Sequence, residues 1–538
     1  MLRIDRSAWL LAIFSGVLQI LIFPLPGLYV LCWVAMAPLL IAILRARKAD
    51  TLQLADSAGV KLVAANMGQG FLLGYVSGII WYAGTCYWVF DTMHQYGGLS
   101  RPAALGILVL FCLYLALYHA GFGALLALTA DRRTSLSRRA LLAAPFLWVA
   151  MELARTRITG FPWNLLGTAQ VDNLPLARIA TFTGVYGLSF EIVLVNTAVA
   201  VAFLVRRDKR KTLLMAALGA AFTLQAGRWI TVPPAMTDHK AELVQANIPI
   251  LDNSAWTKDY FEGTLRDLTR ITLNPAPGAN GEQPTTPVPP SLIVWPESPA
   301  PFYTSDPLFR DTVSNIARKM SAWMLVGAIG VRNATASQAT ETYNSAALVS
   351  PIGEWVARYD KVHLVPFGEY VPFRKLFSFA EGLTKEVGEF GRGTSRQPLD
   401  AGGEKLGVFI CYESVFPDEV RQFAKNGAQV FVNISNDGWY GDSGAYAQHL
   451  QQSRMRAIEN ARWLLLDTDT GVTAAVDPYG KIEASLQRKI RATLVAPYAL
   501  SSVTTFYTRH GDWFAFLCAI ISLLALVTRL PIREKTGS

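Results

Sequence analysis

The chain has 538 residues, of which 52% are hydrophobic and 17% are charged. Soluble domains usually carry about 25% charged residues, so this composition argues against an ordinary soluble protein and indicates a membrane protein. The net charge of +9 lies mostly in short Lys/Arg runs between apolar segments. A nucleic-acid-binding protein would gather such charges on one folded face, so we do not expect nucleic-acid binding.

Eight apolar segments are candidates for transmembrane helices, which need about 20 apolar residues and no fewer than about 17. Pro24 and Pro26 separate the first two segments, which predicts a tight helical hairpin. The fifth segment is short and contains Glu152. We expect residues 1–234 to form a membrane domain of seven helices, and residues 511–538 to form the eighth helix and a tail. The segments are 8–24, 27–45, 69–92, 103–130, 139–155, 182–205, 212–230 and 513–531.

The positive charges predict the orientation of these segments. Lys/Arg runs follow the second, fourth and sixth segments, and loops that carry such runs stay in the cytoplasm. The N-terminus is therefore expected in the cytoplasm. With eight spans the C-terminus lies there too, and it carries Arg529, Arg533 and Lys535. Residues 235–510 are then expected outside the cytoplasm.

Residues 235–510 have the pattern of one α/β domain. Short apolar runs typical of strands alternate with helical patterns at 306–320, 415–426 and 445–462. The stretch 274–290 holds six prolines and two glycines, which predicts a surface loop. The strand-like runs are 241–245, 292–295, 323–329, 346–349, 406–411, 430–434, 463–467 and 473–476.

Three strand ends are expected to supply reactive side chains. Glu297 follows the run 292–295, Cys411 ends the run 406–411, and Lys361 begins a loop after Tyr359. A thiol attacks as its thiolate, which a nearby base and a positive charge both favour. Glu297 can take and return a proton, and Lys361 can stabilise an oxyanion. Each residue also has a structural interpretation, as a buried small hydrophobe, a helix cap or a solvated lysine. Their joint occurrence favours acyl transfer through a thioester.

The sequence predicts neither a metal nor a cofactor. Cys411 is the one cysteine outside the apolar segments, and none of the usual zinc spacings of Cys and His occurs. There is no glycine-rich phosphate loop.

At Glu297, Lys361 and Cys411 the chain resembles the nitrilase superfamily, with its Glu–Lys–Cys triad. Within that superfamily it resembles the apolipoprotein N-acyltransferases, a membrane-bound branch. The resemblance covers nearly the whole chain. It implies a four-layer αββα sandwich between the seventh and eighth helices, with Cys411 as nucleophile, Glu297 as general base and Lys361 as oxyanion stabiliser. The matching strings are 244–249, 295–297, 342–344, 361–369, 411–413, 434–439 and 471–474.

The resemblance also implies supporting roles for five residues. Glu369 matches a second carboxylate of the family site, and Tyr412 and Glu413 match residues beside the nucleophile. Trp256 matches a tryptophan that helps to hold substrate, and Asn344 matches an asparagine that lines the site. Three of them keep a structural alternative: Trp256 as a packing residue, Asn344 in a turn and Tyr412 in the core.

The implied reaction is ping-pong. Cys411 would accept an acyl chain from the sn-1 position of a phospholipid and pass it to the α-amine of an S-diacylglyceryl-cysteine at the N-terminus of an apolipoprotein. The implied location is the bacterial inner membrane, as a multi-pass protein and monomer with its catalytic domain on the periplasmic side. The aromatic and basic segment after Glu369 is expected to border the lipid entrance.

Two other functions remain open at this point. A membrane-tethered amidohydrolase would use the same triad and let water attack the thioester. A transporter or scaffold with an inert outer domain would use ionisable residues in its spans, such as Glu152, Glu191 and Arg228.

Overall fold

The protein divides into two compact units. The first comprises Met1–Tyr87, Leu105–Thr231 and Asp512–Ser538, and the second comprises Trp88–Ala104 and Val232–Gly511. The Pro-rich loop (275–289), the segment after Glu369 (371–389) and the C-terminal basic residues lie outside the described residues. The computed structural model describes residues 3–48, 62–131, 136–205, 207–232, 234–250, 255–274, 290–298, 300–332, 341–370 and 390–528.

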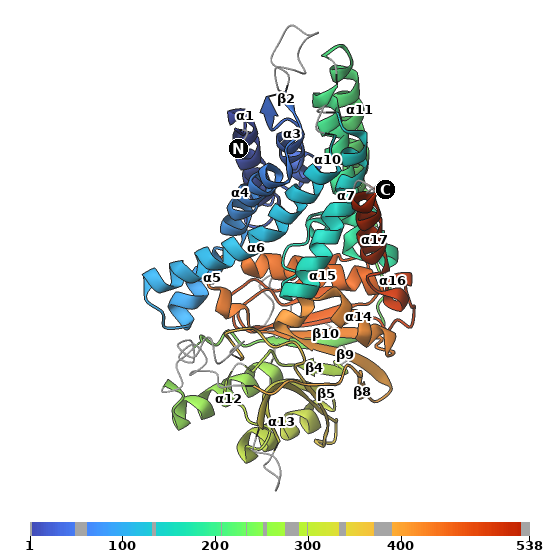
Figure 1. Cartoon of the computed structure of the whole chain (residues 1–538). Coiled ribbons are helices and arrows are strands. Elements are labelled where there is room, and N and C mark those ends of the chain that lie inside the picture. The colour runs from blue at the N-terminus through green and yellow to red at the C-terminus, as the bar shows by residue number, and fades with distance from the viewer. Residues whose placement is uncertain are drawn as a thin grey trace, which may run out of the picture. The chain divides into compact units, whose positions relative to one another are not determined.

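The first unit is helical, and each of the eight predicted apolar segments contains a helix (Figure 1). Two described helices, α6 and α10, are long and apolar enough to cross a membrane. The eight-span prediction is therefore supported only in part, because the helices of the first, second and eighth segments are shorter. The helices are α1 (Arg6–Ile22), η1 (Tyr29–Leu31), α2 (Cys32–Ala35), α3 (Ala37–Leu44), α4 (Met67–Thr85), α6 (Arg101–Thr129), α7 (Arg138–Ala154), η4 (Arg155–Thr159), η5 (Leu166–Gln170), α8 (Leu174–Ala177), α9 (Ala180–Thr183), α10 (Val185–Leu204), α11 (Arg207–Ala226), η6 (Gly227–Trp229) and α17 (Trp513–Val527).

Glycines allow α4 and α6 to pack with their backbones in contact. A Cβ atom added at Gly70 would lie 2.3 Å from the carbonyl oxygen of Gly123, and one at Gly74 would lie 2.2 Å from that of His119. The two glycines are four residues apart, so they share one face of α4. Close packing through small residues at this spacing is typical of helices in membranes.

Two of the three ionisable residues that the transporter hypothesis singled out, Glu152 and Arg228, have local structural partners. Glu152 of α7 accepts a hydrogen bond from the backbone N–H of Leu166 at 2.7 Å. Arg228 of η6 forms an ion pair with Asp172 at 2.8 Å. Neither contact supports a transport pathway.

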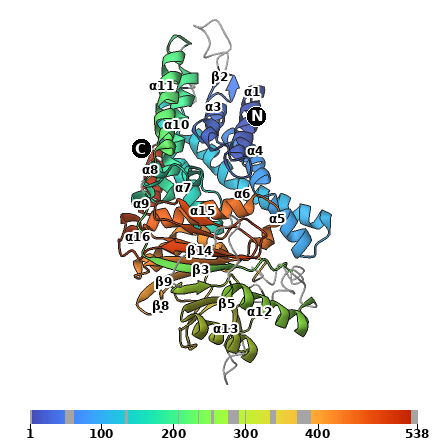
Figure 2. The same cartoon turned by 180° about the vertical axis from the view of Figure 1, so that it is seen from behind.

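The second unit is built on two six-stranded sheets. Figures 1 and 2 show α12 and α13 on the outer face of one sheet and α14 and α15 on the outer face of the other, which gives the four layers of an αββα sandwich. The first sheet has the order β14 (Ala492–Tyr498), β3 (His239–Gln245), β4 (Leu292–Val294), β5 (Trp323–Arg332), β6 (Glu341–Val349), β7 (Trp355–Asp360). The second has the order β13 (Ile482–Ser485), β12 (Ala474–Val476), β11 (Leu464–Thr468), β10 (Val430–Ser435), β9 (Glu404–Ile410), β8 (Leu399–Ala401). The helices are α12 (Lys258–Leu273), α13 (Pro307–Met320), α14 (Pro417–Lys425), α15 (Ala445–Asn460) and α16 (Phe506–His510).

The strands at the centre of the first sheet are apolar on both faces. In β4, Leu292 and Val294 join the core between the sheets, whereas Ile293 joins the core under α12 and α13. Successive side chains of a strand point to opposite faces, so a strand covered on both sides has a continuous apolar sequence. This is why the short run before Glu297 forms a buried central strand.

The outer helix α13 shows how the sequence defines the helical layers. Asp306 caps its N-terminus by accepting a hydrogen bond from the backbone N–H of Phe309 at 2.8 Å, a contact of a kind that stabilises helices by about 1 kcal/mol. Phe309, Val313 and Ile316 are buried at helical spacing and pack in the core under the sheet.

Residues 88–104 belong to the second unit, although the sequence places them in the membrane domain. Thr92 donates a hydrogen bond from its hydroxyl to the carbonyl of Trp439 at 3.0 Å, and the rings of Tyr96 and Trp439 meet edge to face. Trp88 packs edge to face on Tyr440. These aromatic contacts explain why the segment departs from the predicted boundaries; it includes α5 (Trp88–Asp91) and η3 (Thr92–Tyr96).

Candidate active site

The three reactive residues of the sequence analysis follow directly on strands of the sandwich. Glu297 lies just beyond β4, Lys361 follows β7, and Cys411 begins the turn η9 (Cys411–Val415) after β9. Two of them come from the first sheet and one from the second. All three are buried, with exposed fractions of 7%, 1% and 6% respectively.

Lys361 lies between two carboxylates. Its ammonium donates to Oε1 of Glu297 at 3.2 Å and to Oε1 of Glu369 at 2.9 Å. The side-chain amide of Asn344, on β6, donates to the same two oxygens at 2.7 and 2.6 Å. Burial alone would lower the pKa of Lys361, but the two carboxylates outweigh this effect and raise it. Lys361 is therefore a fixed positive charge that interacts with the side chain of Cys411.

Cys411 has a strained backbone and a protonated thiol at rest. Its φ angle is 49°, in the left-handed region that costs a residue with a Cβ atom about 1–3 kcal/mol. Burial and the carboxylate of Glu297 raise the pKa of the Cys411 thiol well above its usual value, against the opposing effect of Lys361. A thiol of this kind needs a base when it reacts, and of the carboxylates around it Glu297 has the largest effect on its pKa.

Glu413 accepts hydrogen bonds from the backbone just before Cys411 and from the backbone just after Lys361. Its Oε2 accepts from the N–H of Ile410 at 2.7 Å, and its Oε1 accepts from the N–H groups of Val362 and His363 at 2.7 and 2.9 Å. The hydroxyl of Tyr359 donates to both carboxylate oxygens at 2.8 and 2.9 Å. Glu413 therefore fixes the turn before Cys411 against the segment after Lys361.

The other two predicted site residues lie in aromatic clusters. Tyr412 is buried and meets Phe416 edge to face, with ring centroids 5.1 Å apart. Trp256 is half-buried and packs edge to face on Tyr260. Trp256 also packs against the core under α12 and α13.

Three contributors to the site were not singled out from the sequence. The backbone N–H of Asn436, just after β10, donates to Oε2 of Glu297 at 2.8 Å. The hydroxyl of Ser435 lowers the pKa of Cys411 by hydrogen bonding, while Asp437 raises it. All three residues lie in the string 434–439 that carries part of the family resemblance. The string was the available signal, but its individual contacts depend on the folded turn.

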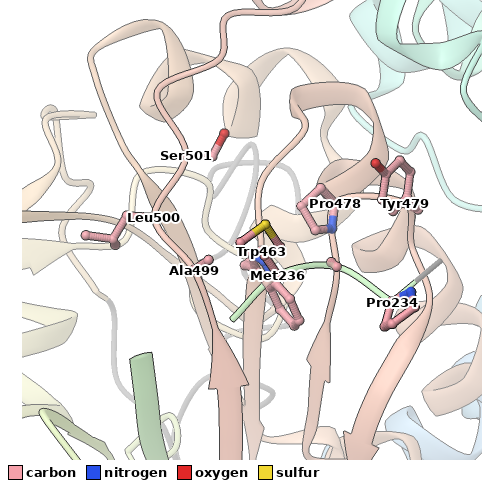
Figure 3. A pocket seen from close by; sticks show the side chains of 9 residues that line it. Pro234, Met236, Trp463, Pro478, Tyr479, Ala499, Leu500 and Ser501 are labelled. Carbon is pink, nitrogen blue, oxygen red and sulfur yellow. The ribbon is translucent and has the colours of Figure 1, made fainter. Parts of the chain in front are cut away.

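A surface hollow in the same unit contains none of these residues. It has a volume of about 340 Å³ and is lined by apolar residues such as Met236, Trp463 and Leu500 (Figure 3). Within the described residues no group of three His, Cys, Asp or Glu side chains is placed to hold a metal ion.

Comparison with known proteins agrees with this geometry. Residues 244–507 match the carbon-nitrogen hydrolase family, and residues 15–198 match the apolipoprotein N-acyltransferase N-terminal domain. A carbon-nitrogen hydrolase from Helicobacter pylori G27 is a similar solved structure. It is 18% identical over 48% of this chain and 88% of its own, with a TM-score of 0.35.

Full-length relatives are more informative. The apolipoprotein N-acyltransferase of Geobacter metallireducens is 35% identical over 99% of this chain and 97% of its own length. That of Nitrosomonas europaea is 33% identical over 87% of this chain and 90% of its own. The second unit is thus a carbon-nitrogen hydrolase domain. The chain as a whole belongs to the apolipoprotein N-acyltransferase family and is an acyltransferase, which confirms the predicted family and the predicted class of enzyme.

Proposed function

We propose that the enzyme transfers an acyl chain from a membrane phospholipid to the α-amine of an N-terminal S-diacylglyceryl-cysteine of apolipoproteins, through a thioester on Cys411. One observation carries the proposal: a buried thiol lies beside an ammonium that is itself held between two carboxylates. This arrangement supplies a nucleophile, a base and a fixed positive charge within one dry site. It is the set of groups that acyl transfer requires.

In the first step Glu297 takes the proton of Cys411, and the sulfur attacks the ester carbonyl at the sn-1 position. Lys361 stabilises the negative charge that develops on the carbonyl oxygen. The tetrahedral intermediate collapses, the ester C–O bond breaks, and Glu297 returns the proton to the leaving oxygen. A lysophospholipid departs, and the acyl chain remains on sulfur.

In the second step the α-amine attacks the thioester. Glu297 takes a proton from the attacking nitrogen, and the C–S bond breaks as the amide forms. The proton returns to sulfur, so the enzyme regains its starting state. Glu369 and Asn344 hold Lys361 and Glu297 in place through both steps, by the hydrogen bonds that they share.

The same proposal places the enzyme in the bacterial inner membrane as a monomer with eight spans. Two long apolar helices and three shorter ones support membrane insertion, and the Lys/Arg runs support a cytoplasmic N-terminus. The carbon-nitrogen hydrolase domain then faces the periplasm, and residues 1–234, 235–510 and 511–538 are the functional divisions of the chain.

Acyl trapping tests the proposal. Purified enzyme is incubated with a phospholipid labelled in its sn-1 chain, and the label on protein is released with hydroxylamine. We expect wild-type enzyme and the Cys112→Ser control, altered in α6, to hold label, and Cys411→Ser to hold none. Added diacylglyceryl-cysteine peptide should then take the label as an amide. Label that passes only to water would instead identify a membrane-tethered amidohydrolase.

A further inference from the structure

A buried histidine, His449 of α15, lies behind the nucleophile and has no part in the steps described above. Its Nδ1 is 3.0 Å from Oδ1 of Asp437, and its Nε2 is 3.1 Å from the backbone oxygen of Cys411. The same Nε2 is 2.7 Å from the hydroxyl of Ser414. The histidine is fully buried and Asp437 is nearly so.

These partners fit two protonation states of the ring. The backbone oxygen of Cys411 can only accept a hydrogen bond, and so can the carboxylate of Asp437, which also accepts from the hydroxyl of Ser435 at 2.8 Å. With Nε2 unprotonated, that nitrogen accepts from the hydroxyl of Ser414. With a proton on both nitrogens the ring donates to both acceptors, and this is the imidazolium form.

The charged and titratable groups that face the ring agree with this form. They are Asp437 and Tyr440 of the turn η10 (Asp437–Tyr440), and Glu297 after β4. Burial lowers the pKa of His449, but the carboxylate of Asp437 more than offsets this effect and the pKa is raised.

The pair also acts on the nucleophile. The negative charge of Asp437 disfavours the Cys411 thiolate, and a positive charge on His449 at hydrogen-bond distance from Asp437 offsets it. The hydrogen bond from His449 also fixes the carbonyl of a residue whose φ of 49° is strained. Without the histidine, the negative charge of Asp437 would no longer be offset, and the carbonyl of Cys411 would lose this hydrogen bond.

We propose that His449 is a positioning residue that cancels the charge of Asp437 beside the thiol and holds the strained backbone turn of Cys411. The proposal rests on the proposed role of Cys411 as the nucleophile. It adds an ionisable pair, Asp437 and His449, to the residues that prepare this thiol for attack.

Alkylation of Cys411 by iodoacetamide as a function of pH measures this effect on the full-length protein. The modified peptide is quantified by mass spectrometry, with Cys411→Ser as the blank. In His449→Gln we expect the midpoint of alkylation to rise by about one pH unit, because the negative charge of Asp437 is no longer offset. Acyl-enzyme formation should fall about tenfold at neutral pH.

A double variant separates this role from a merely structural one. Asp437→Asn combined with His449→Gln removes both charges, and we expect its midpoint to return to within about 0.3 unit of wild type. His239→Gln is the matched control. His239 is the first residue of β3, and its Nδ1 lies 2.5 Å from Oδ1 of the preceding residue, Asp238, so it forms a similar pair. Its alkylation curve should coincide with that of wild type.

Each result decides the proposal. A curve for His449→Gln that coincides with wild type, or a double variant that keeps the raised midpoint, overturns it. If His449→Gln does not fold, a double variant that folds and labels like wild type supports the proposal, and one that does not overturns it. Failure of Cys411 to take an acyl chain would refute the proposed function, while the alkylation curves would still decide the role of His449.

Discussion

The contacts of Glu413 predict a large effect from the replacement of one atom. Glu413→Gln keeps the shape of the side chain but turns one acceptor oxygen into an NH₂ donor. The carboxylate accepts from three backbone N–H groups, those of Ile410, Val362 and His363. If the remaining oxygen keeps Val362 and His363, the N–H of Ile410 faces another donor in a buried place.

The magnitude follows from these bonds. A buried N–H without an acceptor costs about 2 kcal/mol, and the loss of the negative charge weakens the remaining bonds by about 1 kcal/mol. The sum of about 3 kcal/mol falls on the turn before Cys411. If this turn relaxes in the variant, acyl-enzyme formation slows by up to roughly 10²-fold.

The assay is the single-turnover rate of acylation of Cys411, measured on folded, monodisperse enzyme. We expect Glu413→Gln to lose at least a factor of ten. The matched control is Glu341→Gln, which alters a half-exposed carboxylate that also accepts a tyrosine hydroxyl, that of Tyr343. The control should stay close to wild type. A rate for Glu413→Gln within threefold of wild type would refute the reasoning.

Three further changes test other parts of the structure. Asn344→Asp places a third carboxylate against Glu297 and Glu369 with one lysine to balance them, and should lower the acylation rate about tenfold or more in the same assay; an unchanged rate would contradict the hydrogen bonds assigned to this amide. Arg462 is buried and donates to the backbone oxygen of Ala428 at 2.7 Å among other carbonyls, so Arg462→Lys should destabilise the domain by about 2–4 kcal/mol in denaturant unfolding without changing the rate of the folded enzyme. Burial raises the pKa of Glu242 to about 8, so its proton is bound in the folded domain and lost on unfolding between pH 4.5 and 8. Stability should therefore fall as pH rises through this window. Glu242→Gln should reduce that fall, and an equal pH dependence in both proteins would count against it.

The sequence was informative where function depends on the residue that follows a strand. Glu297 and Cys411 lie at the ends of short apolar runs that form the buried strands β4 and β9. Lys361 follows β7, a partly exposed strand that no predicted apolar run covers. The alternation of side chains along such a strand is a local property, so it can be predicted. The meeting of β4, β7 and β9 in one site depends on the order of strands in two sheets. The family resemblance implied the sandwich and the triad, whereas composition and periodicity did not, and the order of the strands was not predicted.

Polar residues that are buried show where prediction from the sequence fails. The helix α15 has a polar sequence, typical of a solvated surface, yet His449, Gln452, Arg456 and Glu459 are all buried in it. They are paired with one another or with backbone groups, as in the ion pair of Arg456 and Glu459 at 2.8 Å. The side chains are buried because α15 covers the sheet, and their partners lie in the same helix or in the turn before it, as Asp437 does for His449. A pattern of hydrophobicity cannot reveal them.

Residues 88–104 give a second example. Their aromatic side chains fit the end of an apolar segment, which places them in the membrane domain. In the structure their partners are Trp439 and Tyr440 in the second unit. The choice between the two positions depends on tertiary contacts with residues more than 300 positions away, and the sequence of the segment itself carries no information about them.

The most direct test of the account is a single-turnover chase of the acyl-enzyme, followed by mass spectrometry of the peptide that contains Cys411. Enzyme acylated by phospholipid is separated from lipid, and diacylglyceryl-cysteine peptide is added. We predict that the peptide carrying Cys411 first gains the mass of one acyl chain. It should then lose that mass at the rate at which N-acylated product appears. An acyl chain found on another residue, or lost at the same rate with and without the acceptor peptide, would contradict the account.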